Sequence, residues 1–183
     1  MTYLPDARAN SGASACCRLA LILIATVADA TPETASGQSC FAPTVLTPGF
    51  YYQVDTCQSS FSPQQLCGEL FPTGPTVVFT FYVAGYSASG YTLTVSPSVG
   101  FDPALIIQTP ECGESANCPF AIDSGGPGMA ETFDLGILER SGQYFALVTS
   151  TNPDASCGTA QMEITYGGAG DTGDGIFRSG FNY

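Results

Sequence analysis

The sequence has 183 residues, a length that fits one domain with additional segments. Four arginines, no lysine and no histidine stand against 16 acidic residues, which gives a net charge of −12. A chain with so few cations cannot neutralise many phosphates, so nucleic-acid binding and adsorption to anionic membranes are excluded. The lack of histidine and lysine also excludes Ser-His-Asp, Cys-His and lysine-based catalysis.

Residues 1–30 have the pattern of an export signal peptide. Arg8 and Arg18 precede an apolar run at residues 19–28, and the small residues of Ala28-Asp29-Ala30 suit a signal peptidase. The apolar run is too short to span a bilayer. We therefore expect cleavage after Ala30 and a mature chain, without a transmembrane segment, outside the cytoplasm.

A polar spacer at residues 31–39 leads into a series of short strand-forming runs between Gly, Pro and Asn turns. The clearest run, TVVFTFYV at 76–83, is apolar on both faces, which indicates a central strand covered on both sides. Since no amphipathic helix interrupts the runs, residues 40–167 are predicted to form an all-β, antiparallel β-sandwich. The eight or nine expected strands are 44–47, 50–54, 76–83, 90–97, 105–107, 120–122, 131–138, 143–149 and 159–167. In the last of these, Met162, Ile164 and Tyr166 are expected to face inward.

Six cysteines remain after the expected cleavage, and an even number in an exported chain predicts three disulfides. Zinc is the poorer interpretation, because the chain has no histidine and no C-x-x-C pair. Cys112 and Cys118 enclose Gly-Glu-Ser-Ala-Asn, which favours a turn. We therefore expect a Cys112–Cys118 disulfide, which would remove about 2 kcal/mol of unfolded-chain entropy. The other four allow three pairings, among which we prefer Cys57–Cys67 with Cys40–Cys157.

Six stretches occur in an order that resembles the bacterial pre-peptidase C-terminal (PPC) domain. They are GPTVVFTFYVAG (74–85), YTLTV (91–95), GFDPALIIQTPECG (100–113), CPFAID (118–123), ETFDLGIL (131–138) and SGQYFALV (141–148). The resemblance implies a jelly-roll-like sandwich that accompanies secreted enzymes and has no catalysis of its own. It also implies calcium binding, or engagement of insoluble substrates such as collagen or chitin, in some members.

Residues 168–183 form a Gly/Asp-rich linker and tail. GDGIFRSGFNY at 173–183 is similar to short C-terminal segments of exported proteins of Gram-negative bacteria, through Asp174, Ile176, Phe177, Gly180 and Phe181. The similarity implies an export or surface-sorting tag. We therefore expect a protein that a Gram-negative bacterium secretes or keeps at its cell surface or in its periplasm. The alternative is an aromatic strand that docks on the sandwich.

Two sets of carboxylates are candidate calcium ligands, and no other cofactor is expected. Asp171 and Asp174 alternate with glycine turns in a way that suits calcium. Asp102, Asp123 and Glu131 stand at the ends of predicted strands, where they can meet in space. The alternative for both sets is a role in turns and solubility.

Five tyrosines exceed what a core requires and are candidates for a binding face. Exposed in one plane, they would stack on sugars or pack on fibrous protein. The alternative is packing in the core and between the sheets. The five are Tyr51, Tyr52, Tyr82, Tyr86 and Tyr91.

The sequence thus predicts a non-catalytic β-sandwich that acts as a binding or accessory module towards extracellular protein or polysaccharide. One alternative is a structural or adhesive surface protein sorted by its tail. The other is a hydrolase that uses paired carboxylates, Glu111 with Glu114 or Asp171 with Asp174. It is disfavoured because these residues lie on loops or the tail rather than on a rigid scaffold.

Overall fold

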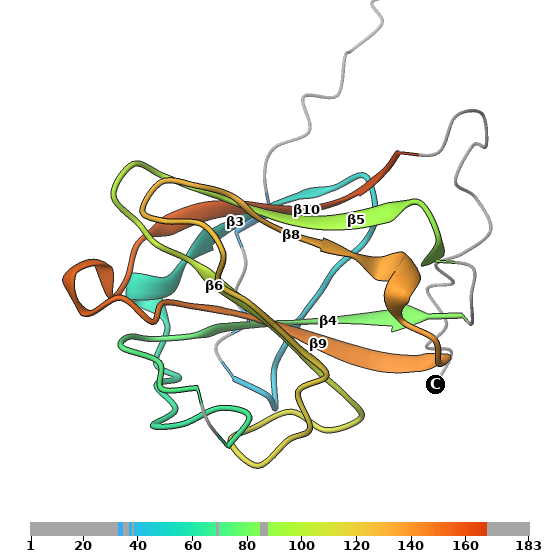
Figure 1. The fold of residues 1–183 in the computed structure, drawn as a ribbon, viewed down its shortest axis with the longest axis horizontal. Helices are drawn as coiled ribbons and strands as arrows, with labels where there is room; N and C mark the ends of the chain where they lie inside the picture. The colour runs from blue at the N-terminus through green and yellow to red at the C-terminus, as the bar shows by residue number, and fades with distance from the viewer. Residues whose placement is uncertain (1–32, 35–36, 38, 69, 85–87, 168–183) are drawn as a thin grey trace, which may run out of the picture. The chain divides into compact units, whose positions relative to one another are not determined.

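The computed structural model describes residues 33–34, 37, 39–68, 70–84 and 88–167, which form two five-stranded sheets (Figure 1). This arrangement confirms the predicted all-β sandwich. Sheet A has the strand order β1-β3-β10-β5-β8, formed by Glu33–Thr34, Tyr51–Asp55, Thr159–Tyr166, Tyr91–Pro97 and Glu131–Asp134. Sheet B has the order β2-β4-β9-β6-β7, formed by Thr44–Val45, Val77–Val83, Gly142–Thr149, Ala104–Gln108 and Phe120–Ile122.

The chain crosses from one sheet to the other at nearly every connection. Within the described residues, β6 and β7 form the one pair of consecutive strands that stay in the same sheet. The longer strands pair antiparallel, whereas the two-residue strands β1 and β2 pair parallel with β3 and β4 at the sheet edges. Each predicted strand has a counterpart, and β1 is an addition inside the predicted spacer.

The expected signal peptide at residues 1–30 lies outside the described residues, as do Tyr86 and the tail with Asp171 and Asp174. No helix among the described residues is long and apolar enough to cross a membrane. The helices there are single 3₁₀ turns: η1 (Thr56–Gln58), η3 (Leu135–Ile137) and η4 (Pro153–Ala155).

The predicted strand at 131–138 ends earlier than expected. β8 stops at Asp134, whose carboxylate accepts a hydrogen bond from Gly136 N at 2.8 Å and so begins the turn η3. The turn breaks the alternation that a strand over 131–138 would continue, so Ile137 is 46% exposed whereas Phe133 and Leu135 are buried. An aspartate two residues before a glycine gives the chain a local alternative to the sheet ladder.

The main core lies between the two sheets. Alternate residues of β5 and β10 are buried against alternate residues of β4, β6 and β9, as the period of two requires. Burying each large apolar side chain contributes about 1.5–3 kcal/mol. Phe101, which precedes β6, joins this core and packs on Gly158, where an added Cβ would lie only 2.6 Å from the Phe101 ring.

A second apolar cluster covers the outer face of sheet B. Its members on the strands are Val78, Ile106, Phe145 and Leu147, and Leu66 covers them from a loop. The loop at 59–75 and the loop at 109–119 lie side by side over this face (Figure 1). The expectation that 76–83 is a strand covered twice is therefore confirmed for Val78, while Tyr82 at its end is exposed.

Three disulfides form from the six expected cysteines, but the expected pairing is wrong. Cys40 bonds to Cys112, Cys57 to Cys157 and Cys67 to Cys118, with Cα–Cα distances of 5.5, 5.1 and 5.2 Å. The pairs Cys112–Cys118, Cys57–Cys67 and Cys40–Cys157 are not formed. The Cys57–Cys157 bond joins the ends of the neighbouring strands β3 and β10. The Cys40–Cys112 and Cys67–Cys118 bonds fasten separate segments to the outer side of sheet B.

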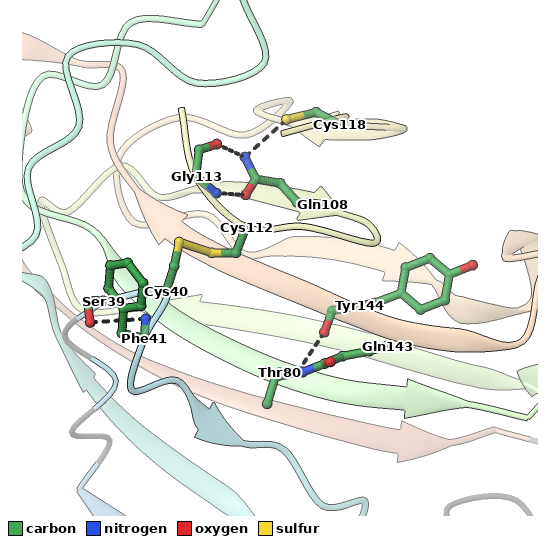
Figure 2. Close-up of a disulfide and its surroundings, with 10 residues drawn as sticks. All are labelled: Ser39, Cys40, Phe41, Thr80, Gln108, Cys112, Gly113, Cys118, Gln143 and Tyr144. Atoms are coloured by element: carbon green, nitrogen blue, oxygen red, sulfur yellow. Dashed lines mark hydrogen bonds between the residues drawn. A yellow bond between two sulfur atoms is a disulfide. The ribbon is translucent and has the colours of Figure 1, made fainter. Parts of the chain in front are cut away.

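A buried amide closes the loop at 109–118 in place of the expected disulfide. Gln108 Nε2 donates to Gly113 O, and Gly113 N donates to Gln108 Oε1, both at 2.9 Å (Figure 2). Gln108 Nε2 also lies 3.3 Å from Cys118 Sγ. Because Gln108 holds the loop, Cys112 and Cys118 are free to bond to different segments, and Figure 2 shows Cys112 joined to Cys40.

Candidate functional site

The three carboxylates predicted to meet at the strand ends bind protein donors instead of a common point. Glu131 is fully buried and accepts from Ser124 N and Ser124 Oγ at 3.0 Å and from Gly125 N at 2.6 Å. Its role is to hold the start of the loop between β7 and β8. A Cβ on Gly125 would lie 2.9 Å from Glu131 Oε1, so a larger residue there would displace the carboxylate.

The two aspartates of that set are tied to the loop that follows β9. Asp123 Oδ2 accepts from Thr151 Oγ1 at 2.5 Å, and Asp102 Oδ2 accepts from Asn152 Nδ2 at 2.9 Å. Asp102 Oδ1 is buried without a hydrogen-bond partner. Among the described residues, no group of three or more His, Cys, Asp or Glu side chains is placed to hold a metal ion. The expected three-carboxylate calcium site is therefore not assembled there.

The predicted tyrosines do not form one plane. Tyr52 and Tyr91 are core residues. Tyr51 and Tyr82 are 48% and 47% exposed, but Tyr51 is on β3 of sheet A and Tyr82 on β4 of sheet B. Of the five, Tyr51 and Tyr91 lie at a common surface feature.

That feature is a groove of about 410 Å³ at one end of sheet A, which we call the tyrosine groove. β10 forms one wall with its last four residues, and the turn before β3 forms another. The residues that line it are Pro48, Gly49, Tyr51, Tyr91, Glu163, Ile164, Thr165 and Tyr166.

The strand register explains how these residues come together. Glu163 on β10 is paired with Tyr51, the first residue of β3, so the two side chains emerge next to each other. Beyond this pair the Pro48-Gly49 turn, instead of β3, lies beside β10, and Gly49 N donates a hydrogen bond to Ile164 O at 3.1 Å. On the other side of β10, Tyr166 is paired with Tyr91 of β5.

Two aromatic rings form the inner end of the groove. Tyr91 and Tyr166 have ring centroids 4.8 Å apart at an interplanar angle of 45°. Tyr91 is buried and Tyr166 is 37% exposed, so the buried ring supports the exposed one. Tyr166 thus lies on the expected face of β10, with Met162 and Ile164, but it stays partly exposed because it stands at the end of the strand and of the apolar core.

The groove carries a negative charge, and no cation lines it among the residues that the structure describes. Arg140 is the only lysine, arginine or histidine among the described residues, and it does not line the groove. The carboxylate of Glu163 accepts no hydrogen bond from the described part of the chain and is half-buried beside Tyr51. The site therefore offers aromatic surfaces with one carboxylate.

A second hollow, of about 600 Å³, lies over the outer side of sheet B. Its lining is apolar and includes the Cys67–Cys118 disulfide, with Phe71 64% exposed at its edge. The remaining lining residues are Leu70, Ala121 and Thr151. No charged side chain of the described residues lines it.

Of the two carboxylate pairs considered for hydrolysis, Glu111 and Glu114 lie on the loop at 109–119, and Asp171 and Asp174 lie outside the described residues. Glu114 Oε1 accepts a hydrogen bond from Gln64 N at 2.9 Å, which joins this loop to the loop at 59–75. Glu111 is exposed. The described geometry gives Glu114 a structural contact.

Sequence reasoning identified Tyr51 and Tyr91 but missed Glu163, Tyr166 and the Pro48-Gly49 turn. The alternation along 159–167 places Glu163 on the outer face of the sheet, and this alternation was the one sequence signal that could have indicated Glu163. No protein-family model matches the chain, and no curated protein is significantly similar to it.

Proposed function

We propose that this chain is a non-catalytic extracellular binding module that holds a polysaccharide or protein ligand at the tyrosine groove. The observation that carries the proposal is a groove whose lining includes two partly exposed tyrosines, Tyr51 and Tyr166, together with Glu163. Exposed tyrosines supply a large, rigid contact area with a polar tip, which suits both sugar rings and extended polypeptide.

Two further features support the proposal. Three disulfides of long sequence separation fit an oxidising compartment outside the cytoplasm. The order of elements also resembles the PPC domain, whose members accompany secreted enzymes, and on this basis we propose a jelly-roll-like accessory module.

The test is retention of residues 31–183 on insoluble chitin, cellulose, collagen and peptidoglycan. We expect at least one matrix to retain the protein, and Tyr51→Ala or Tyr166→Ala to weaken retention about tenfold to thirtyfold. Tyr82→Ala is the matched control, because Tyr82 is as exposed as Tyr51 but lies on the other sheet.

Equal retention of the Tyr51→Ala and Tyr82→Ala proteins would show that the groove is not the binding site. Failure of all four matrices to retain the protein would also count against the proposal.

A further inference from the structure

We infer that the tyrosine groove seats residues 176–183 of the same chain, which we call the C-terminal segment, through an ion pair between Arg178 and Glu163. The inference goes beyond the proposed function, because it names what occupies the groove when no ligand is bound. The C-terminal segment, IFRSGFNY, lies outside the described residues, and the observations that select it come from the groove.

Glu163 is a carboxylate in need of a partner. It is half-buried on the outer face of β10 and accepts no hydrogen bond from the described residues. Glu111, Glu139 and Asp154 accept none either, but they are exposed, and water solvates an exposed carboxylate well. A half-buried charge is screened less by salt than an exposed one, so Glu163 gains more from a cation.

The sequence offers few cations that could supply this partner. After the expected cleavage at residue 30, the remaining cations are Arg140 and Arg178. Arg140 precedes β9 and does not line the groove. Arg178 is the one charged side chain of residues 176–183. Charge complementarity therefore selects the C-terminal segment as the occupant.

The path of the chain keeps Arg178 within reach. β10 ends at Tyr166, which lines the groove, so the chain leaves from the groove itself. Glu163 lies four residues before Gly167, which is about 13 Å along an extended strand. Residues 167–175 contain five glycines, so the path from Gly167 to Arg178 behaves as a flexible chain with an end-to-end distance of about 18 Å. Such a tether gives an effective concentration in the millimolar range.

The apolar surfaces of the groove and the C-terminal segment also match. The groove offers Pro48 and the partly exposed Tyr51. Tyr51 is the cross-strand neighbour of Glu163, so an arginine at this carboxylate also has an aromatic side chain beside it. Three large apolar side chains stand within three residues of Arg178, and they are Ile176, Phe177 and Phe181.

Fluorescence from one introduced tryptophan measures the docking, because the chain contains no tryptophan. Residues 31–183 with Phe177→Trp are compared with the same reporter protein that also carries Glu163→Gln. We expect the tryptophan of the first protein to be protected from acrylamide quenching, and Glu163→Gln to lower the docking equilibrium constant about fivefold. Glu139→Gln is the matched control, because it removes an exposed carboxylate outside the groove and should leave the protection unchanged.

Exchanging the charges separates the ion pair from other effects of the substitutions. Glu163→Arg and Arg178→Glu should each remove most of the protection in the reporter protein, and the two together should restore it. The protection should not depend on protein concentration, because groove and segment belong to one chain.

Quenching equal to that of a free peptide of residues 173–183 with the same tryptophan would overturn the inference. Equal protection before and after Glu163→Gln would overturn it as well. Protection that grows with protein concentration would assign the segment to the groove of a second copy and would also overturn it. The proposed function is judged separately, by retention on the matrices, and its failure would leave the fluorescence result unchanged.

Discussion

Replacing both Cys67 and Cys118 by alanine should lower the free energy of unfolding by about 3.5–4 kcal/mol. The magnitude follows from the covalent path that remains. With Cys40–Cys112 intact, Cys67 and Cys118 are still linked through roughly 33 residues, 27 from Cys40 to Cys67 and six from Cys112 to Cys118. Closing a ring of that size removes about 3.7 kcal/mol of unfolded-chain entropy in the loop-closure model.

The same ring is opened when Cys40 and Cys112 are replaced instead, so the two double variants should be destabilised nearly equally. The assay is equilibrium urea unfolding of residues 31–183, followed by far-UV circular dichroism. Both variants should contain no free thiol when alkylated under denaturing, non-reducing conditions. A third variant with alanine at Cys67 and Cys112 breaks two bonds and should expose two free thiols.

The reasoning would be refuted if either matched pair exposed free thiols, because the connectivity would then differ. It would also be refuted by a loss of less than about 1 kcal/mol, since the ring would then not constrain the unfolded chain as the loop-closure model requires.

Three further predictions concern single residues. Glu131→Gln should lower the free energy of unfolding by about 2 kcal/mol in urea titrations, because the buried carboxylate accepts three hydrogen bonds. The control is Glu139→Gln at an exposed position, which should change the free energy of unfolding by less than about 0.5 kcal/mol. Burial raises the pKa of the Tyr144 phenol above its ordinary 10.0, so the folded state keeps a proton that the unfolded chain loses. The contribution of Tyr144 to the free energy of unfolding is therefore complete below pH about 10 and is lost as the pH rises through the raised pKa. Tyr144→Phe should flatten the fall in the free energy of unfolding that is measured from pH about 8 to about 11. Gly158→Ala should cost about 1–3 kcal/mol in thermal or urea unfolding, because the new Cβ would overlap the Phe101 side chain; an unchanged stability would mean that Phe101 moves freely.

The strands could be predicted because their signals are local. Alternation of apolar residues and intervening Gly, Pro and Asn turns locate β4, β5 and β10 to within a residue or two. The exception is instructive: in ETFDLGIL the apolar residues keep the alternation, but Asp134 and Gly136 form a turn. Side-chain hydrogen bonding to the backbone overrides the pattern there.

The disulfides could not be predicted because their partners depend on tertiary structure. Short spacing favoured Cys112–Cys118, yet all three bonds span 51 to 100 residues of sequence. Their partners depend on which loops cover the outer face of sheet B, and Gln108, a residue with no sequence signal of this kind, closes the intervening loop.

The groove was half-predictable for a similar reason. Tyr51 and Tyr52 are neighbours, and alternation alone does not say which faces solvent. The partnership of Tyr51 with Glu163, and of Tyr91 with Tyr166, comes from the register of β10 between β3 and β5. Those two strands are far from β10 in the sequence, so no local pattern encodes the contact.

The central claim is that the tyrosine groove is where this protein meets its ligand. The most direct measurement is amide chemical-shift mapping of residues 31–183 with a soluble fragment of whichever matrix retains the protein. We predict that the largest shifts fall on Gly49, Glu163, Thr165 and Tyr166. Shifts centred on Leu70, Phe71 and Ala121, at the apolar hollow outside sheet B, would contradict the claim.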